Sequence, residues 1–103
     1  MSGHMVQGHV DTLTTVTDIE KVSDDLWNFY FQNNNFKYIV DKGSITINGV
    51  SLTLVNPSDD NFSVSIIRET FDRTNFNNLK VGSSVNIEFD IMAKYVERAL
   101  NDK

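Results

Sequence analysis

Apolar and polar residues alternate with a period of two along several segments of the chain. The most regular segment is residues 84–90, in which three apolar side chains alternate with polar ones. Because successive side chains of a strand point to opposite faces of a sheet, this pattern predicts a half-buried β-strand. Residues 26–31 and 62–66 alternate in the same way, and the apolar face of residues 26–31 is aromatic.

Two further segments predict a hairpin. Residues 44–47 and 50–55 are rich in β-branched side chains, and Asn48 and Gly49 lie between them. Asn-Gly suits a two-residue type I′ turn, because both positions accept a positive φ. Residues 11–19 predict another strand, and their less regular pattern indicates a bulge.

The remaining patterns add short helices to this set of strands. Residues 35–41 carry apolar side chains at spacings of three and four before Gly43, which predicts a turn of helix, and residues 91–100 also fit a helix. About six short strands with frequent turn signals are typical of a small all-β domain. We therefore expect a six-stranded antiparallel Greek-key barrel with short helical segments, formed by residues 1–103 as a single domain.

Composition narrows the functional classes. The formal net charge is −5 and the nine Lys and Arg residues are scattered, so the sequence does not predict a nucleic-acid surface. The chain has no cysteine, which excludes disulfides and zinc–cysteine sites. Its apolar runs are too short to cross a bilayer, and no signal peptide is recognisable. We expect a soluble cytoplasmic domain that does not bind a membrane.

The two histidines, His4 and His9, are open to two interpretations. They lie five residues apart in a glycine-containing segment, a poor metal signature without a third ligand, so no metal site is predicted. The residues around His4 also look like the remnant of a cleaved tag. Spacing alone favours no functional role for either histidine.

Several polar residues could bind a small ligand. Lys42 precedes a predicted strand, and Ser51 and Thr53 share one face of the next strand. Residues 68–70 follow the end of a strand, where ligand-binding loops often lie, and Asp90 ends the last strand. All of these residues also suit an ordinary solvent-facing surface. From the residues alone, the interpretation stops at a β-barrel able to bind a small polar ligand.

Four segments taken together resemble a known family. They are GHMVQGHVD at 3–11, KYIVDKGS at 37–44, INGVSLT at 47–53, and VNIEFD at 85–90, which is followed by AKYVER at 93–98. Their order and spacing are similar to the C-terminal half of the riboflavin synthases, across nearly the whole chain.

The resemblance implies a function. Riboflavin synthases have two similar barrels and a C-terminal helix, are usually trimeric, and need no metal or redox cofactor. Each barrel binds one 6,7-dimethyl-8-ribityllumazine, and two such molecules dismutate to riboflavin and a pyrimidinedione. The site lies between the N-terminal barrel of one subunit and the C-terminal barrel of another. We therefore expect half an active site, weakly active or inactive alone, in a monomer or homodimer. The alternative is a non-catalytic lumazine- or flavin-binding module.

The resemblance also assigns residues. Those that match ligand-binding positions of the family are Gly8, His9, Val10, Lys42, Ser51, Leu52, Thr53, Ile67, Arg68, Glu69, Thr70, Phe71 and Asp72. His9 matches a candidate for proton transfer, because the 7-methyl group of the lumazine is acidic. Asp90 matches a carboxylate that lies near the ribityl chain or takes part in the proton transfers, and His4 matches a histidine near the site.

The sequence departs from the family pattern at two of its motifs. Arg68 stands where proline is common, which predicts a less rigid segment before Thr70. Asn48 stands where many members have aspartate, which preserves the turn chemistry but removes a charge.

Overall fold

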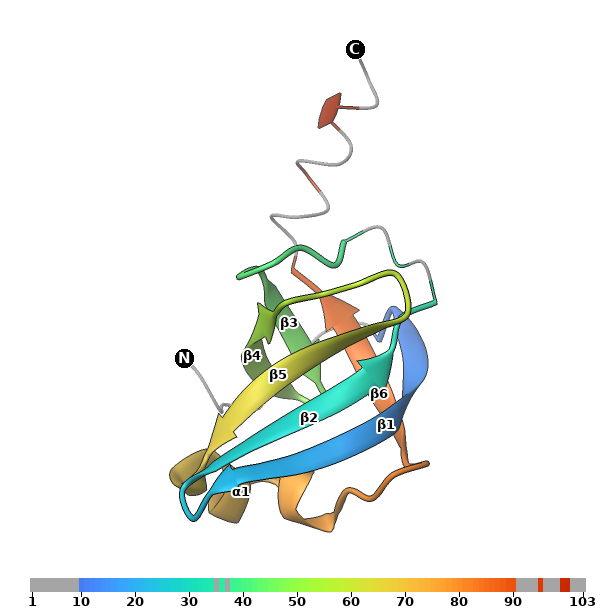
Figure 1. The fold of residues 1–103 in the computed structure, drawn as a ribbon. Helices are drawn as coiled ribbons and strands as arrows, with labels where there is room; N and C mark the ends of the chain where they lie inside the picture. Colours follow the sequence, from blue (N-terminus) through green and yellow to red (C-terminus); the bar gives the residue numbers. More distant parts are fainter. Residues whose placement is uncertain (1–9, 35, 37, 91–94, 96–98, 101–103) are drawn as a thin grey trace.

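The computed structural model describes residues 10–34, 36, 38–90, 95 and 99–100 of the chain. Within them, six antiparallel strands close into a barrel in the order β1-β2-β5-β4-β3-β6 (Figure 1). The strands are β1 (Thr12–Ser23), β2 (Leu26–Gln32), β3 (Ser44–Ile47), β4 (Val50–Val55), β5 (Asn61–Ile67) and β6 (Ser84–Phe89). Strands β3, β4 and β5 are sequential neighbours and β6 returns beside β3, which is Greek-key connectivity. The predicted fold class is confirmed.

The hairpin between β3 and β4 follows the sequence prediction. Asn48 and Gly49 have φ values of 50° and 83°, both positive as a type I′ turn requires. The turn fixes the register, with Ile47 opposite Val50. The predicted irregularity of the first strand is also confirmed, since its pairing with β2 shifts register after Val16 and again after Lys21.

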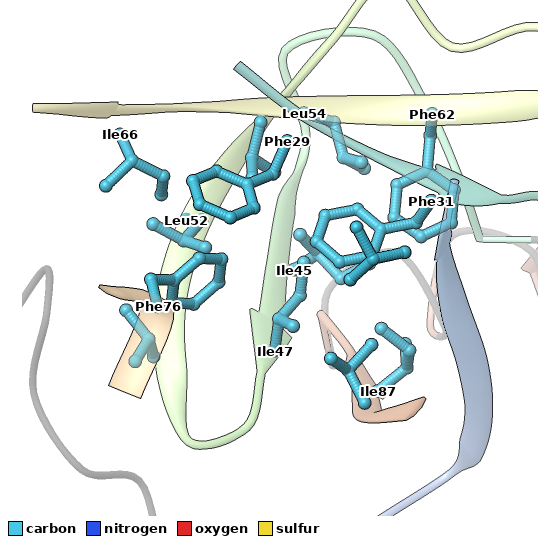
Figure 2. Packing of buried hydrophobic residues seen from close by; sticks show 14 of the residues in the cluster. Phe29, Phe31, Ile45, Ile47, Leu52, Leu54, Phe62, Ile66, Phe76 and Ile87 are labelled. Carbon is cyan, nitrogen blue, oxygen red and sulfur yellow. The ribbon is translucent and has the colours of Figure 1, made fainter. Parts of the chain in front are cut away.

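The inward faces of the six strands form one apolar core. The predicted aromatic face of β2 is buried, and it supplies much of this core (Figure 2). Phe29 meets Phe76 edge to face with ring centroids 5.1 Å apart, and Phe31 stacks on Phe62 at 5.4 Å. Aromatic pairs of this kind add about 0.5–1.5 kcal/mol beyond the burial of their area. The Phe31–Phe62 stack and a ladder of seven pairs together hold β2 against β5.

The helix predicted over residues 35–41 is wrong for the residues that the structure describes there, which form turns and irregular chain. The Asn33 side chain accepts a hydrogen bond from the Phe36 N–H at 3.1 Å, which competes with helix formation. The Gly43 N–H donates to Val40 O at 3.0 Å and forms a turn. The apolar spacing instead reflects packing, because Phe36 and Ile39 lie against the core at one end of the barrel.

The opposite end of the barrel carries two helical turns where we expected a loop. They are α1 (Arg68–Arg73) and the 3-10 helix η1 (Asn75–Asn78) (Figure 1). Ion pairs at i,i+4 spacing, Arg68–Asp72 at 3.7 Å and Glu69–Arg73 at 3.6 Å, support α1. The fully buried Phe76 side chain of η1 closes this end of the core.

The helix predicted over residues 91–100 lies mostly outside the described residues. Tyr95, Ala99 and Leu100, which are described, have helical backbone conformation. A search of the described part of the chain finds no helix with the length and apolar character needed to span a membrane.

Candidate functional site

The barrel is unevenly paired on the two sides of β5. Strands β2 and β5 pair at seven positions, from Leu26↔Ile67 to Gln32↔Asn61. Strands β4 and β5 pair only at Leu54↔Val64 and Val55↔Ser63. Residues 51–53 and 65–67, all described, therefore face each other without a ladder between them. We call these two segments the open seam.

Hydrogen bonds further along β4 show which of its backbone groups face the open seam. The Leu54 N–H donates to Gly43 O at 2.8 Å, and Leu54 O accepts from the Lys42 N–H at 3.0 Å. Leu54 thus directs both of its backbone groups toward the β3 side. Because this direction alternates along a strand, the backbone groups of Ser51 and Thr53 face β5.

The same argument applies to β5. The Asn33 N–H donates to Asp60 O at 2.9 Å on the β2 side, so that even-numbered residues of β5 face β2. The backbone groups of Ser65 and Ile67 therefore face β4. Donors and acceptors from both walls of the open seam thus point into the same space, where they can bind a planar polar molecule.

Side chains make the open seam polar on the outside and closed on the inside. Ser51 and Thr53 point outward, whereas Leu52 between them is buried in the core, and the alternation predicted from sequence is confirmed. On β3, Thr46 lies opposite Ser51 and Ser44 opposite Thr53, which adds two hydroxyls to the same outer surface. The open seam is therefore a shallow surface site that does not reach the core.

Lys42 lies close to one end of the open seam. Its N–H is bonded to Leu54 O, next to Thr53, and its side chain is exposed. Its φ is 63°, a left-handed conformation that costs a residue with a β-carbon about 1–2 kcal/mol. Strained residues of this kind concentrate at functional positions, so the backbone of Lys42 agrees with a role in binding.

Asp90 and Val10 lie on the far side of β3 from the open seam. Phe89 pairs with Ile45, so Asp90 comes next to Ser44 at the end of β6. The distance from Asp90 to Thr53 spans two strand spacings, roughly 10 Å. Val10 precedes Asp11, whose N–H donates to Ile87 O, and it therefore lies one strand further away. Gly8, His9 and His4 lie outside the described residues.

The segment 67–72 divides into two parts. Ile67 is the last residue of β5 and forms part of the open seam, with 57% of its surface exposed. Arg68, Glu69, Thr70, Phe71 and Asp72 belong to α1, directly after the open seam. Thr70 is half-buried and Phe71 packs against the core, whereas the other three side chains are exposed. Only Thr70 of this helix combines a hydroxyl with partial burial.

The sequence analysis did not single out three further hydroxyls beside the open seam, those of Ser44, Thr46 and Ser65. The positions of Ser44 and Thr46 on β3 could have been predicted from the sequence, because the Asn48-Gly49 turn fixes their register opposite Thr53 and Ser51. The place of Ser65 in the open seam had no such signal, since it depends on the point where the β4–β5 ladder ends. Among the described residues, no group of three or more His, Cys, Asp or Glu side chains could hold a metal.

The outer surface of β1, β2 and β5, which shares Ser65 with the open seam, carries a chain of hydrogen bonds between polar side chains. Ser65 Oγ donates to Asn28 Oδ1 at 2.8 Å, and Asn28 Nδ2 donates to Glu20 at 3.0 Å. The Tyr30 hydroxyl donates to the same carboxylate at 3.3 Å. Partial burial, and then the negative charge of Glu20, raise the pKa of Tyr30 above its usual value.

Comparison with known proteins identifies relatives of this barrel. Residues 7–90 match the family described as the lumazine binding domain. The riboflavin synthase of Actinobacillus pleuropneumoniae is 42% identical over 102 residues, which are 98% of this chain and 47% of that protein. The chain spans about half the length of the curated relatives it matches.

Solved structures agree with the sequence relatives. The crystal structure of LumP complexed with 6,7-dimethyl-8-(1'-D-ribityl) lumazine is similar with a TM-score of 0.76 and 28% identity, over 82% of this chain and 49% of that one. The structure of LumP complexed with riboflavin has a TM-score of 0.76 and 27% identity, over 87% and 49%. Together with the family match over most of the sequence, these similarities show that the chain belongs to the lumazine-binding domain family and is homologous to one half of riboflavin synthase.

Proposed function

We propose that this barrel binds one 6,7-dimethyl-8-ribityllumazine or riboflavin molecule at the open seam, as one of the two barrels of a riboflavin synthase. The observation that carries the proposal is the end of the β4–β5 ladder at Leu54↔Val64. Beyond it, backbone donors and acceptors of both strands converge beside outward hydroxyls. LumP, a structural neighbour, is complexed with both compounds.

The chemistry of the ring suits these groups. Lumazines and flavins share a pyrimidinedione edge, which carries an imide N–H between two carbonyl oxygens. Such an edge can form hydrogen bonds with the backbone of Thr53 and Ser65. These bonds would resemble those between paired strands. The hydroxyls of Ser51 and Thr53 and the Lys42 ammonium group supply further polar contacts at the rim.

The position of Asp90 favours one of its two expected roles. With the ring at the open seam, a carboxylate roughly 10 Å away, two strand spacings, is too distant to take a proton from the ring methyl group. A ribityl chain that crosses Ser44 would approach Asp90. We therefore assign Asp90 to the ribityl hydroxyls of the ligand on this barrel, and keep His9 as the candidate for proton transfer.

The catalytic part of the proposal concerns two barrels together. Dismutation requires two lumazines to lie face to face, and one barrel holds one of them. We therefore expect turnover only when a second barrel brings the second ligand. The alternative, a non-catalytic binding module, is favoured by the similarity to LumP. It predicts the same binding and no turnover with any added barrel.

Fluorescence titration tests the binding step. Trp27 is the only tryptophan, and it lies opposite Ile66, one strand away from the open seam. Riboflavin bound there should quench Trp27 emission, because flavin absorption overlaps tryptophan emission. Thr53→Val should weaken binding several-fold. Thr17→Val, an exposed threonine on β1, is the matched control and should leave affinity unchanged. Absence of quenching in the wild-type protein at high micromolar riboflavin would refute the proposed site.

A turnover assay tests the catalytic step separately. The lumazine should be converted to riboflavin only after addition of the N-terminal barrel of a related riboflavin synthase, and His9→Ala should slow that reaction. Binding without turnover in the mixture would support the binding module instead.

A further inference from the structure

Arg68 is bonded to the turn between β1 and β2 at three points. Its Nε donates to Asp25 Oδ1 at 3.0 Å, and its Nη2 donates to Asp24 O. Its backbone N–H donates to Asp25 O at 3.0 Å. The turn and the start of α1 lie side by side at the same end of the barrel (Figure 1). The arginine that we expected to loosen this segment is thus held by side-chain and backbone bonds.

Two rings extend this contact into the core. The Arg68 guanidinium lies 5.0 Å from the ring centroid of Trp27. Trp27 stacks on Phe71 of α1 with centroids 3.9 Å apart and planes 2° from parallel. Stacking of this kind restricts the helix in both position and orientation. We call Asp24, Asp25, Trp27, Arg68 and Phe71 the Arg68 cluster.

The Arg68 cluster lies next to one wall of the open seam. Arg68 directly follows Ile67, whose backbone faces β4, and Thr70 comes two residues later. Because the Arg68–Asp25 pair is largely exposed, the ion pair adds little to global stability. Its effect is local, since it holds the end of β5 and the start of α1 against the β1–β2 turn.

We infer that Arg68 and Asp25 are positioning residues, which set the geometry of the open seam from the far side of β5 without touching the ligand. This inference rests on the proposed function, because it concerns the same site. The family resemblance implied that Arg68 contacts the ligand directly, and the inference assigns it an indirect role instead. Proline limits the backbone through its ring, whereas the arginine here limits it through bonds to a neighbouring turn.

A double-mutant cycle for riboflavin affinity tests the inference. Arg68→Gln and Asp25→Asn should each weaken binding several-fold, and the double variant should bind no more weakly than either single one. Arg73→Gln is the matched control, because it breaks the exposed Glu69 pair on the same helix, and its affinity should equal that of the wild type. Additive losses in the double variant, or unchanged affinity in the single ones, would overturn the inference while the proposed function stands.

Hydrogen exchange without ligand gives a second readout that does not depend on the proposed function. The amides of Arg68 and Thr74, bonded to Asp25 O and Thr70 O, should exchange several-fold faster in Arg68→Gln and Asp25→Asn than in Arg73→Gln. Equal exchange in all three variants would show that the Arg68 cluster does not hold α1, whatever the ligand result. If the exchange rates were as expected but the wild-type protein failed to bind riboflavin, the proposed ligand site would be refuted, whereas the anchoring of α1 by the Arg68 cluster would stand.

Discussion

The two edges of β5 are paired with their neighbours over very different lengths. On the β2 side the ladder runs the full length of the strand, and the side chains beneath it, such as Phe29 and Ile66, are buried. On the β4 side the ladder ends after two pairs, although the side chains beneath it are equally buried. One strand therefore shows that a barrel can keep a closed core where the ladder along one of its edges ends early.

The difference has a physical basis. Core burial depends on the inward face, and backbone pairing depends on the edges, so the two can be changed independently. At the open seam the inward side chains of Leu52 and Ile66 are buried in the core, while the neighbouring outward side chains form the surface. Such a site requires little loss of apolar burial.

Neighbouring isoleucines give the largest expected contrast. Ile66 is 1% exposed and Ile67 is 57% exposed, although both end β5. Ile66→Ala should lower the free energy of unfolding by about 2–5 kcal/mol, and Ile67→Ala by less than about 1 kcal/mol. Urea denaturation measures both values. For riboflavin affinity we expect the reverse, since only Ile67 faces the ligand. Equal losses of stability would contradict the assignment of the two faces.

Two serines on the β4 side of β5 compare a paired position with an unpaired one. Ser63 lies opposite Val55 in the closed part of the ladder, and Ser65 lies in the open seam. Replacement of Ser63 by proline should cost about 3 kcal/mol more than replacement by alanine, because a ladder hydrogen bond is lost. At Ser65 the difference should be clearly smaller, and the proline should weaken riboflavin binding. A proline cost as large at Ser65 as at Ser63 would show that the open seam is paired in solution.

The strands of this fold could be predicted from the sequence, but the point where the β4–β5 ladder ends could not. Alternation and the Asn48-Gly49 turn predicted the register that brings Ser51 and Thr53 to one surface, because both are local signals. The end of the β4–β5 ladder depends on strands that lie apart from that hairpin and on how far the barrel twists there. No local pattern records it, and the anchoring of Arg68 by Asp25, across 43 residues, is equally non-local.

Apolar spacing misled the helix prediction for residues 35–41 for a similar reason, and α1 was not predicted. The spacing of Phe36 and Ile39 reflects their contacts with the core at the barrel end, and the Asn33 side chain competes for the Phe36 N–H. In α1 the two ion pairs have the i,i+4 spacing that the sequence displays, but the Phe71–Trp27 stack joins residues far apart in the chain and has no local pattern.

Lys42 allows stability and binding to be separated. Because its φ is 63°, Lys42→Gly should raise the free energy of unfolding by up to about 1 kcal/mol. The same change removes a cation beside the open seam and should weaken binding of the lumazine several-fold. Lys80→Gly is the control at an exposed lysine without positive φ, and it should not stabilise the protein. Tighter binding by Lys42→Gly would exclude the proposed role of its ammonium group.

The smallest expected effect lies on the outer face of the closed edge. Folding raises the pKa of Tyr30 above 10.0, through partial burial and then the charge of Glu20. Between the unfolded and folded pKa values the folded protein binds more protons, so this contribution to stability is complete below pH 10 and is lost as the pH rises through the folded pKa. Ultraviolet titration of the Tyr30 phenol should show a lower pKa in Glu20→Gln. Unfolding at pH 9 and 11 should show a smaller loss in Tyr30→Phe than in the wild type.

Riboflavin affinity at neutral pH should be the same in the wild type, Glu20→Gln and Tyr30→Phe, because Glu20 and Tyr30 belong to the side of β5 that the proposed ligand does not use. If Glu20→Gln weakened binding as much as Thr53→Val does, the two edges would not be independent. The hydrogen-bonded chain from Glu20 through Asn28 to Ser65 would then have to be counted as part of the site.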